Sequence, residues 1–285
     1  MSALLIIAGT DSSGGAGLTC DIAAATAMAQ RLPLFTQRSP ALRPVVTAVT
    51  VQTDTALEEI QPTPPEIIQS QIRAAAATGP ISAVKIGMVG SAMAAESIAK
   101  ALALSVPDTC PVVLDPVLRS SSGGRLMQAS DLKPLIARAN LITPNVQEAA
   151  QLAPCLSDRQ PDSPDAPGNA SQTRRLQQAR QLQDAGADAV LIKGGHGGGA
   201  LSVDHLFFGD AHIRYERPRL PRGRRGTGCT LATAIAVQLM TGRGLDQACA
   251  NAGDYVHEWM KEAATRAAPP SPSKRSQPDL ALDAQ

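Results

Sequence analysis

Short apolar runs alternate with helical segments along most of the chain, and this alternation limits the folds that it can adopt. The runs have the length of buried strands and are rich in Val, Ile, Leu and Ala; they are residues 4–8, 45–51, 83–89, 112–117, 140–143 and 189–192. Most of them precede a turn and an apolar helical segment, which is typical of a parallel sheet covered by helices on both faces. We therefore predict an α/β fold with a mostly parallel central sheet.

Residues 1–264 are predicted to form a single domain, because no interior linker interrupts the alternation. Within it, residues 31–44 are punctuated by Pro and Arg, which predicts an irregular excursion. Residues 154–172 combine Pro, Asp, Ser and Gly with almost no large apolar side chain, which is typical of a mobile surface insertion. Residues 265–285 have no apolar period and predict a disordered tail.

Charge and composition argue against several classes of partner. The net charge is +1 and only 2% of the residues are aromatic, so we expect neither a basic nor a base-stacking surface for nucleic acid. No apolar run is long enough to span a bilayer, and the first residues predict a buried strand rather than a signal peptide. The cysteines are scattered without a CxxC pair, which disfavours disulfides or a zinc site and favours a reduced, cytoplasmic setting.

A glycine pair precedes an almost purely apolar stretch, residues 231–240, that predicts a buried helix. Gly226, Thr227 and Gly228 would then lie at a helix N-terminus, where free N–H groups and the helix dipole favour a phosphate. Cys229 would lie at the mouth of the same site, where a thiolate is favoured. Phosphoryl transfer is one interpretation, and a loop that merely closes onto a core helix is the other.

Polar side chains follow the other predicted strands. Asp115 and Lys193 each end a strand, and Asn145 and Glu148 follow a third. Because the carboxyl ends of parallel strands share one edge of the sheet, these groups predict a single active site. Asn145 and Glu148 either hold Mg²⁺ through water or form an N-capping pair. Lys193 is either a phosphate contact or an exposed edge residue.

A glycine- and serine-rich loop, residues 9–17, joins the first predicted strand to the first helix. It lacks the lysine of a GxxxxGK[ST] loop and the spacing of GxGxxG, so neither nucleotide-binding pattern applies. The loop either lines a substrate pocket or caps the helix that follows it.

Six short motifs follow one another along the predicted domain. They are Ala-Gly-Thr-Asp-Ser-Ser-Gly-Gly-Ala-Gly at 8–17 followed by Asp21, Lys-Ile-Gly-Met at 85–88, Asp-Pro-Val at 115–117, Thr-Pro-Asn-Val-Gln-Glu-Ala at 143–149, Lys-Gly-Gly-His at 193–196 and Gly-Thr-Gly-Cys-Thr-Leu at 226–231. In kind and order these motifs resemble those of the ribokinase-type kinases, and among them the hydroxymethylpyrimidine/phosphomethylpyrimidine kinases of thiamine biosynthesis. The resemblance implies a ribokinase-like version of the predicted α/β fold.

The activity that this resemblance implies is the ATP- and Mg²⁺-dependent phosphorylation of the hydroxymethyl group of 4-amino-5-hydroxymethyl-2-methylpyrimidine. Phosphorylation of the resulting monophosphate to the diphosphate would follow. The implied partner is a small-molecule pyrimidine, and the implied assembly is a homodimer. Composition and cysteine usage add that no nucleic acid and no membrane partner is expected and that the location is cytoplasmic.

The resemblance also implies roles for individual residues. Gln52 matches the position that hydrogen-bonds the pyrimidine, and the pocket around it is matched by Gly9, Asp11, Ala16, Asp21, Met88 and Val117. Nucleotide- and phosphate-binding positions are matched by Thr143, Asn145, Glu148 and Lys193, and water-mediated magnesium ligands by Asp115, Asn145 and Glu148. The anion hole is matched by Gly226, Thr227 and Gly228, and the base by Cys229, whose pKa the helix terminus is expected to bring toward neutrality.

The chain departs from the family pattern at several positions. Arg225 stands where the family usually has histidine, which adds charge beside the phosphates, and Ala23 and Ala24 replace a Lys-Thr pair. The family's Gln-Asn-Thr appears as Gln-Thr-Asp at 52–54. These differences leave two alternatives open, a pyridoxal or pyridoxine kinase and a non-catalytic pyrimidine-binding sensor. A sugar kinase is disfavoured, because Cys229 replaces the aspartate that those enzymes use.

Overall fold

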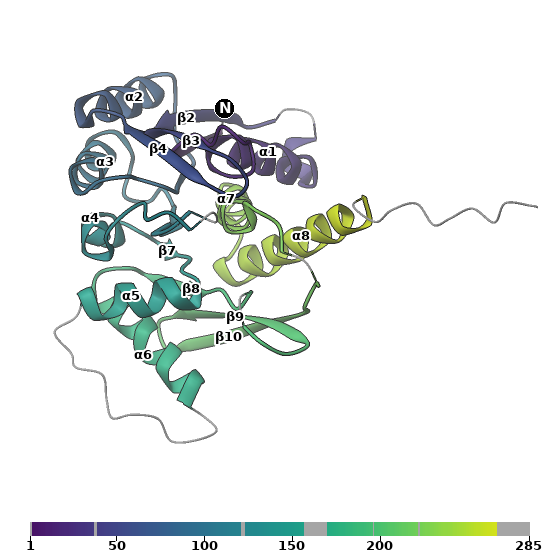
Figure 1. Ribbon diagram of the computed structural model, residues 1–285. Helices are drawn as coiled ribbons and strands as arrows, with labels where there is room; N and C mark the ends of the chain where they lie inside the picture. The colour runs from purple at the N-terminus through teal and green to yellow at the C-terminus, as the bar shows by residue number, and fades with distance from the viewer. Residues whose placement is uncertain are drawn as a thin grey trace, which may run out of the picture.

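The computed structural model describes residues 2–36, 39–120, 123–156, 170–195, 197–221 and 223–266. Its centre is an eight-stranded sheet with the order β10-β9-β8-β7-β6-β5-β1-β2 (Figure 1). The strands are β1 (Ala3–Ala8), β2 (Ala41–Val46), β5 (Ala83–Ile86), β6 (Val112–Leu114), β7 (Leu141–Ile142), β8 (Ala189–Ile192), β9 (Leu201–Phe208) and β10 (Ala211–Pro218). The run from β2 to β8 is parallel and β9 and β10 are antiparallel, which confirms the predicted mostly parallel sheet.

Helices cover both faces of this sheet (Figure 1). One core is shared with α2 (Pro65–Ala77), α3 (Ala92–Ser105), α4 (Lys133–Ile136), α5 (Val146–Leu156) and α6 (Ala170–Asp184). The other is shared with α1 (Gly17–Gln30), α7 (Thr227–Leu239) and α8 (Leu245–Arg266). Alternate residues of β1 enter the two cores: Leu5 and Ile7 enter the first, and Leu4 and Ile6 the second. This two-sided burial explains why the strand is continuously apolar.

A second, two-stranded antiparallel sheet lies outside the main sheet and consists of β3 (Ala48–Gln52) and β4 (Leu57–Pro62). The single strand predicted over residues 45–51 is therefore wrong, because β2 ends at Val46 and the chain leaves the main sheet at Thr47. Thr47 is buried, and its hydroxyl donates to the carbonyl of Met88 at 2.6 Å. That contact fixes the point at which the chain changes sheets.

All three of the predicted irregular segments are partly regular. The excursion expected over residues 31–44 contains a 3₁₀ turn, η1 (Pro33–Phe35), and the start of β2. Pro44 is tolerated in β2 because this strand is at the edge of the sheet. The insertion expected over residues 154–172 begins inside α5 and ends inside α6, and the tail expected from residue 265 begins inside α8. Residues 37–38, 157–169 and 267–285 lie outside the described residues. The single-domain boundary stays a prediction.

A 3₁₀ turn, η2 (Ala129–Leu132), precedes α4. In the part of the chain that the structure describes, no helix combines the length and the apolarity that crossing a bilayer requires.

Candidate active site

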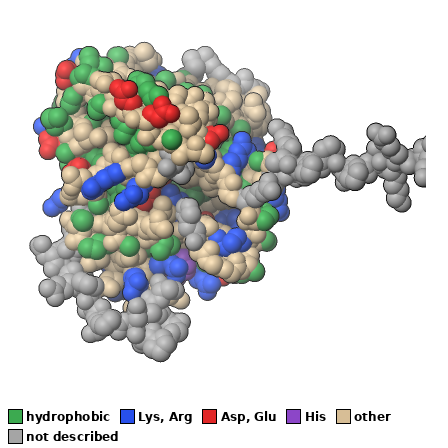
Figure 2. All heavy atoms as spheres, viewed as in Figure 1, with side chains coloured by type: hydrophobic (Ala, Val, Ile, Leu, Met, Phe, Trp, Pro, Cys, Tyr) green, Lys and Arg blue, Asp and Glu red, His purple; other side chains and the backbone are tan. Residues whose placement is uncertain are grey.

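A pocket of about 830 Å³ lies at the edge where the parallel strands end. It gathers most of the site residues predicted from the sequence, namely Gly9, Asp11, Ala16, Gln52, Met88, Asp115, Val117, Asn145, Glu148, Lys193, Gly226, Thr227, Gly228 and Cys229. Figure 2 shows Lys and Arg side chains on both sides of the hollowed middle of one face. The predicted convergence of far-apart segments on one site is present in the structure, while the role of each residue stays a prediction.

The glycine pair forms the N-terminus of α7. Gly226 is the N-cap with φ +75°, and no side chain caps this end, so the first-turn N–H groups have no capping partner of that kind. A Cβ on Gly226 would lie 2.5 Å from the carbonyl oxygen of Gly15 and 2.6 Å from Cys20 Sγ. A Cβ on Gly228 would lie 3.2 Å from Lys193 Nζ and 3.5 Å from Asp115 Oδ2. At Gly226 the backbone therefore passes too close to its neighbours for a side chain, and at Gly228 it faces the Lys193 cation, as an anion site requires.

Lys193 is not an exposed edge residue. Its Nζ donates to Asp115 Oδ1 at 2.8 Å, and its side chain is 14% exposed. Asp115 is also held by the hydroxyl of Thr143, which donates to the same oxygen at 3.3 Å. Thr143 is fully buried and does not line the pocket, so its place is behind Asp115 rather than against a ligand. The ion pair places the Lys193 cation beside Gly228.

Asn145 and Glu148 cap the start of α5 reciprocally. The Asn145 N–H donates to Glu148 Oε2 at 2.7 Å, and the Glu148 N–H donates to Asn145 Oδ1 at 2.8 Å. This geometry confirms the capping-pair interpretation of their spacing. Both residues also line the pocket beside Asp115. Among the residues that the structure describes, no group of three or more His, Cys, Asp and Glu side chains could hold a metal ion.

Burial raises the pKa of Glu148 from its ordinary value of 4.5 to about 7, against the opposing effect of Lys193, while Asp115 raises it further. The protonated form is thus favoured in the folded protein. Burial alone would lower the pKa of Lys193, but Asp115 and Glu148 outweigh it and raise that pKa. Lys193 therefore carries its charge at neutral pH, whereas Glu148 changes charge there.

Replacing Glu148 by glutamine is expected to remove one pH dependence of the folding stability. Because its folded pKa is raised, Glu148 stabilises the wild type below pH 4.5 and loses this contribution as the pH rises through about 7. The loss should be roughly 3 kcal/mol, because each unit of pKa shift corresponds to about 1.4 kcal/mol. Urea unfolding of wild type and Glu148→Gln from pH 4 to 8 measures it, with Glu258→Gln on an exposed acid as the matched control. Parallel curves for wild type and Glu148→Gln would contradict the assignment.

Cys229 lines the pocket from the first turn of α7 and is partly exposed. Burial raises the pKa of its thiol to about 12, against the opposing effect of the Lys85 cation. We expected the helix terminus to bring this pKa toward neutrality, but the pKa is raised instead, because burial outweighs the effect of the Lys85 cation. The thiol is protonated at neutral pH in this structure.

Asp21 does not line the pocket, in contrast to the pyrimidine contact that we expected. Its side chain has no exposed surface and accepts from Lys85 Nζ at 2.6 Å and from the hydroxyl of Thr233 at 2.9 Å. Lys85 is also fully buried. Burial alone would lower the pKa of Lys85, but the carboxylate of Asp21 raises it. This pair joins α1 to β5, and Lys85 is also one of the residues that line the pocket.

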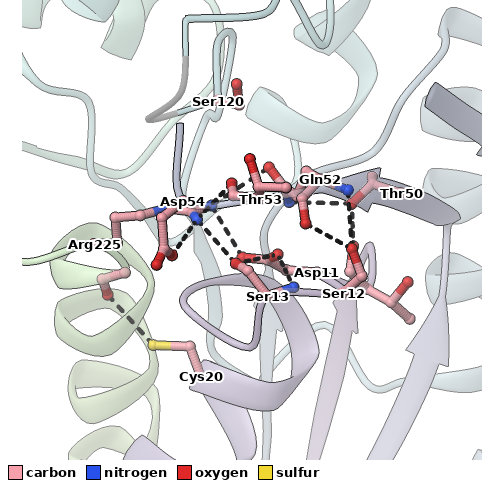
Figure 3. A network of polar contacts seen from close by, with 12 residues as sticks. Asp11, Ser12, Ser13, Cys20, Thr50, Gln52, Thr53, Asp54, Ser120 and Arg225 are labelled. Carbon is pink, nitrogen blue, oxygen red and sulfur yellow. Dashed lines mark hydrogen bonds and ion pairs between the residues drawn. The ribbon is translucent and has the colours of Figure 1, made fainter. Parts of the chain in front are cut away.

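The loop of residues 9–17 lines the pocket, and no side chain from it caps α1. Its Asp11 carboxylate accepts from the N–H and hydroxyl of Ser13 through one oxygen and from Arg225 through the other. Arg225 also reaches Gln52 and the segment that follows β3 (Figure 3). The positive charge of Arg225, which we expected beside the phosphates, is therefore already paired with the Asp11 and Asp54 carboxylates. Arg225, Asp11 and Gln52 line the opposite side of the pocket, called the acceptor side below.

Sequence reasoning missed the part of the pocket formed by α8 and the end of β10. α8 contributes an apolar wall with Val256 and Met260, and Arg224 stacks on Trp259 with its guanidinium carbon 3.6 Å from the ring centre. Arg219 donates to several carbonyls of the glycine-rich loop after β8, among them that of Gly199, and to the carbonyl of Leu201 at the start of β9. These residues belong to no short sequence motif, so their place in the pocket becomes visible only from contacts between distant parts of the chain. His196, part of a motif quoted above, lies outside the described residues.

Comparison with known proteins identifies relatives over most of the chain. The family model described as phosphomethylpyrimidine kinase matches residues 11–269. The hydroxymethylpyrimidine/phosphomethylpyrimidine kinase of Aquifex aeolicus is 32% identical over 91% of this chain and 94% of its own length. The thiamine biosynthesis bifunctional protein ThiED of Geobacter sulfurreducens is 34% identical over 89% of this chain, which spans 48% of that protein.

Solved structures share the fold. A phosphomethylpyrimidine kinase from Clostridium difficile 630 has a TM-score of 0.70 and 28% identity over 91% of this chain and 99% of its own. A pyridoxal kinase from Staphylococcus aureus in complex with ADP has a TM-score of 0.73 over 90% of this chain and 87% of its own, at 23% identity. The second likeness concerns the fold alone.

Proposed function

The chain belongs to the phosphomethylpyrimidine kinase family, and from this membership we propose that it phosphorylates 4-amino-5-hydroxymethyl-2-methylpyrimidine and then its monophosphate, with ATP as donor, in thiamine biosynthesis. The observation that supports this most strongly is a single pocket in which the expected acceptor-side residue Gln52 and the glycine start of α7 both take part. An acceptor alcohol and a terminal phosphate could therefore meet there.

The geometry suits phosphoryl transfer because that reaction depends mainly on positioning and on charge stabilisation at the phosphoryl oxygens. In the proposed arrangement the first-turn N–H groups of α7 and the Lys193 cation receive the transferred group. Gln52 holds the ring on the other side, and the thiolate form of Cys229, a small fraction at neutral pH, takes the proton of the acceptor hydroxyl. The apolar wall of α8, with Val256 and Met260, would accept the nucleobase.

Asp115 and Glu148 are two carboxylates beside the phosphate site, with the Asn145 carboxamide next to them. This donor set fits Mg²⁺, which usually keeps several waters and takes one or two carboxylates together with phosphate oxygens. The bound ion would neutralise charge that develops on the phosphate. Because Mg²⁺ favours an ionised carboxylate, it should stabilise wild type more than Glu148→Gln above pH 7.

A coupled ADP-release assay tests the function directly. We expect ATP-dependent turnover with the pyrimidine alcohol and with its monophosphate, and much slower turnover with pyridoxal. Faster turnover of pyridoxal would favour the vitamin B6 kinase alternative, which the fold alone also allows. Binding of the pyrimidine without any ADP release would favour a sensor.

A homodimer and a cytoplasmic location remain proposals. The location is supported by the scattered cysteines of the sequence. Sedimentation equilibrium measures the assembly state, and a monomer at micromolar concentration would contradict the dimer.

A further inference from the structure

Arg225 is the centre of a polar network on the acceptor side of the pocket (Figure 3). It directly precedes the anion-site glycines, and its guanidinium reaches two other segments of the chain. Nη1 donates to Ser13 Oγ at 2.9 Å, Thr53 O at 2.9 Å and Asp54 Oδ1 at 3.0 Å, and Nη2 donates to Asp11 Oδ2 at 3.1 Å and Gln52 Oε1 at 3.4 Å. One side chain thus ties the start of α7 to the loop after β1 and to the end of β3.

The amide of Gln52 has one allowed orientation in this network. A guanidinium only donates hydrogen bonds, so the amide oxygen must face Arg225. At the other end, the hydroxyl of Thr50 donates to the carbonyl of Thr10 at 2.8 Å, so its oxygen accepts from Gln52 Nε2 at 3.0 Å. Two independent contacts therefore impose the same orientation.

The main chain of Gln52 is held as firmly as its side chain. Its N–H donates to Ser12 Oγ at 2.9 Å, and the Ser12 hydroxyl donates back to the Gln52 carbonyl at 2.7 Å. The residue before the bend of the β3–β4 hairpin is thereby fixed to the loop after β1. Little freedom remains for the amide to turn over when a ligand enters.

The network leaves the Gln52 amide with one N–H and one oxygen lone pair unused by the contacts above, because an amide offers two donors and two acceptor positions. A ring that carries an amine next to a ring nitrogen presents the matching donor and acceptor side by side, as adenine does to Asn or Gln. Pyridoxal presents an aldehyde and a ring hydroxyl on the corresponding edge. A fixed amide therefore distinguishes the two rings, whereas an amide that can rotate accommodates both.

We propose that Arg225 is a specificity-determining positioning residue, which fixes the Gln52 amide so that the pocket prefers an aminopyrimidine alcohol to pyridoxal. This inference rests on the proposed function. The planar fork of arginine is essential to it, because a lysine ammonium cannot reach Asp11, Asp54 and Gln52 together. The two carboxylates keep the guanidinium in place, so its charge is used for orientation.

The test compares Arg225→Lys and Thr50→Val, which release opposite ends of the same amide. For each we expect the ratio of kcat/KM for the aminopyrimidine alcohol to kcat/KM for pyridoxal to fall at least about tenfold, mainly through a higher KM for the pyrimidine. Thr50→Ser keeps the hydroxyl and should restore the ratio. Arg214→Lys, on an exposed arginine paired with Glu216, is the matched control and should leave it unchanged.

Equal losses for both alcohols, or an unchanged ratio in Arg225→Lys and Thr50→Val, would overturn the proposal, as would a wild type without preference. Thermal unfolding of each variant shows whether it is folded. If the wild type releases no ADP with either alcohol, the proposed function fails, and calorimetric dissociation constants of the two alcohols then replace kcat/KM in the same comparison. The assignment of Arg225 is thus decided separately from the activity.

Discussion

Replacing Cys229 by alanine or serine is expected to lower kcat by roughly 10²–10⁴-fold, the usual contribution of a general base, with the KM for ATP nearly unchanged. The sulfur lines the pocket from the first turn of α7, beside the anion-site glycines. Its loss should therefore affect the proton transfer more than nucleotide binding.

The pH profile adds a second readout for Cys229. Because burial raises the pKa of its thiol to about 12, the thiolate fraction in the wild type rises throughout the neutral and alkaline range. Turnover should rise with it, and Cys229→Ala should lose this slope. Cys155→Ala, on an exposed cysteine, is the control and should behave as wild type. Wild-type kcat in purified Cys229→Ala would refute the role of base.

Replacing Lys85 by methionine is expected to destabilise the folded protein by about 3–5 kcal/mol, because it leaves the Asp21 carboxylate buried without its cation. The hydroxyl of Thr233 would remain its partner among the bonds described above. The double variant Asp21→Asn, Lys85→Met should recover much of the loss, since neutral groups carry a far smaller desolvation penalty. Urea unfolding at pH 7 measures both.

A surface ion pair provides the contrast to Lys85. Arg31 and Glu258 lie 2.7 Å apart with side chains 45% and 57% exposed, and Glu258→Gln should cost less than about 1 kcal/mol. If Lys85→Met lowered the free energy of unfolding by no more than Glu258→Gln does, the buried pair would not be important to stability. A double variant less stable than Lys85→Met would mean that Asp21 has a role other than pairing with Lys85.

The sequence predicted the fold class and the family correctly because both depend on local signals. Alternating apolar runs indicate a parallel sheet, and strand-end residues such as Asp115 and Lys193 share an edge in any sheet of that kind. The family motifs then predicted which of them meet, and the pocket contains nearly all of them. The role of each residue in the reaction still awaits the experiments above.

The failed predictions concern contacts between residues distant in sequence. Asp21 pairs with Lys85, 64 positions along the chain, and this pairing removes it from the pocket. Arg225 reaches Asp11 across 214 positions, which local patterns do not reveal. The pKa of Cys229 depends on how much protein surrounds it, so its direction could not be inferred from the helix terminus. β4 was missed because its exposed, charged residues lack an apolar alternation.

The reciprocal cap formed by Asn145 and Glu148 has a consequence for ligand affinity. Each side-chain oxygen already accepts a hydrogen bond from a backbone N–H at the start of α5. A cation that recruits either oxygen competes with the helix for it, and losing one cap interaction costs about 1 kcal/mol. Ion affinity at this edge and order in the first turn of α5 are therefore in thermodynamic competition, and a variant that weakens the cap without removing a ligand oxygen would bind the ion more tightly.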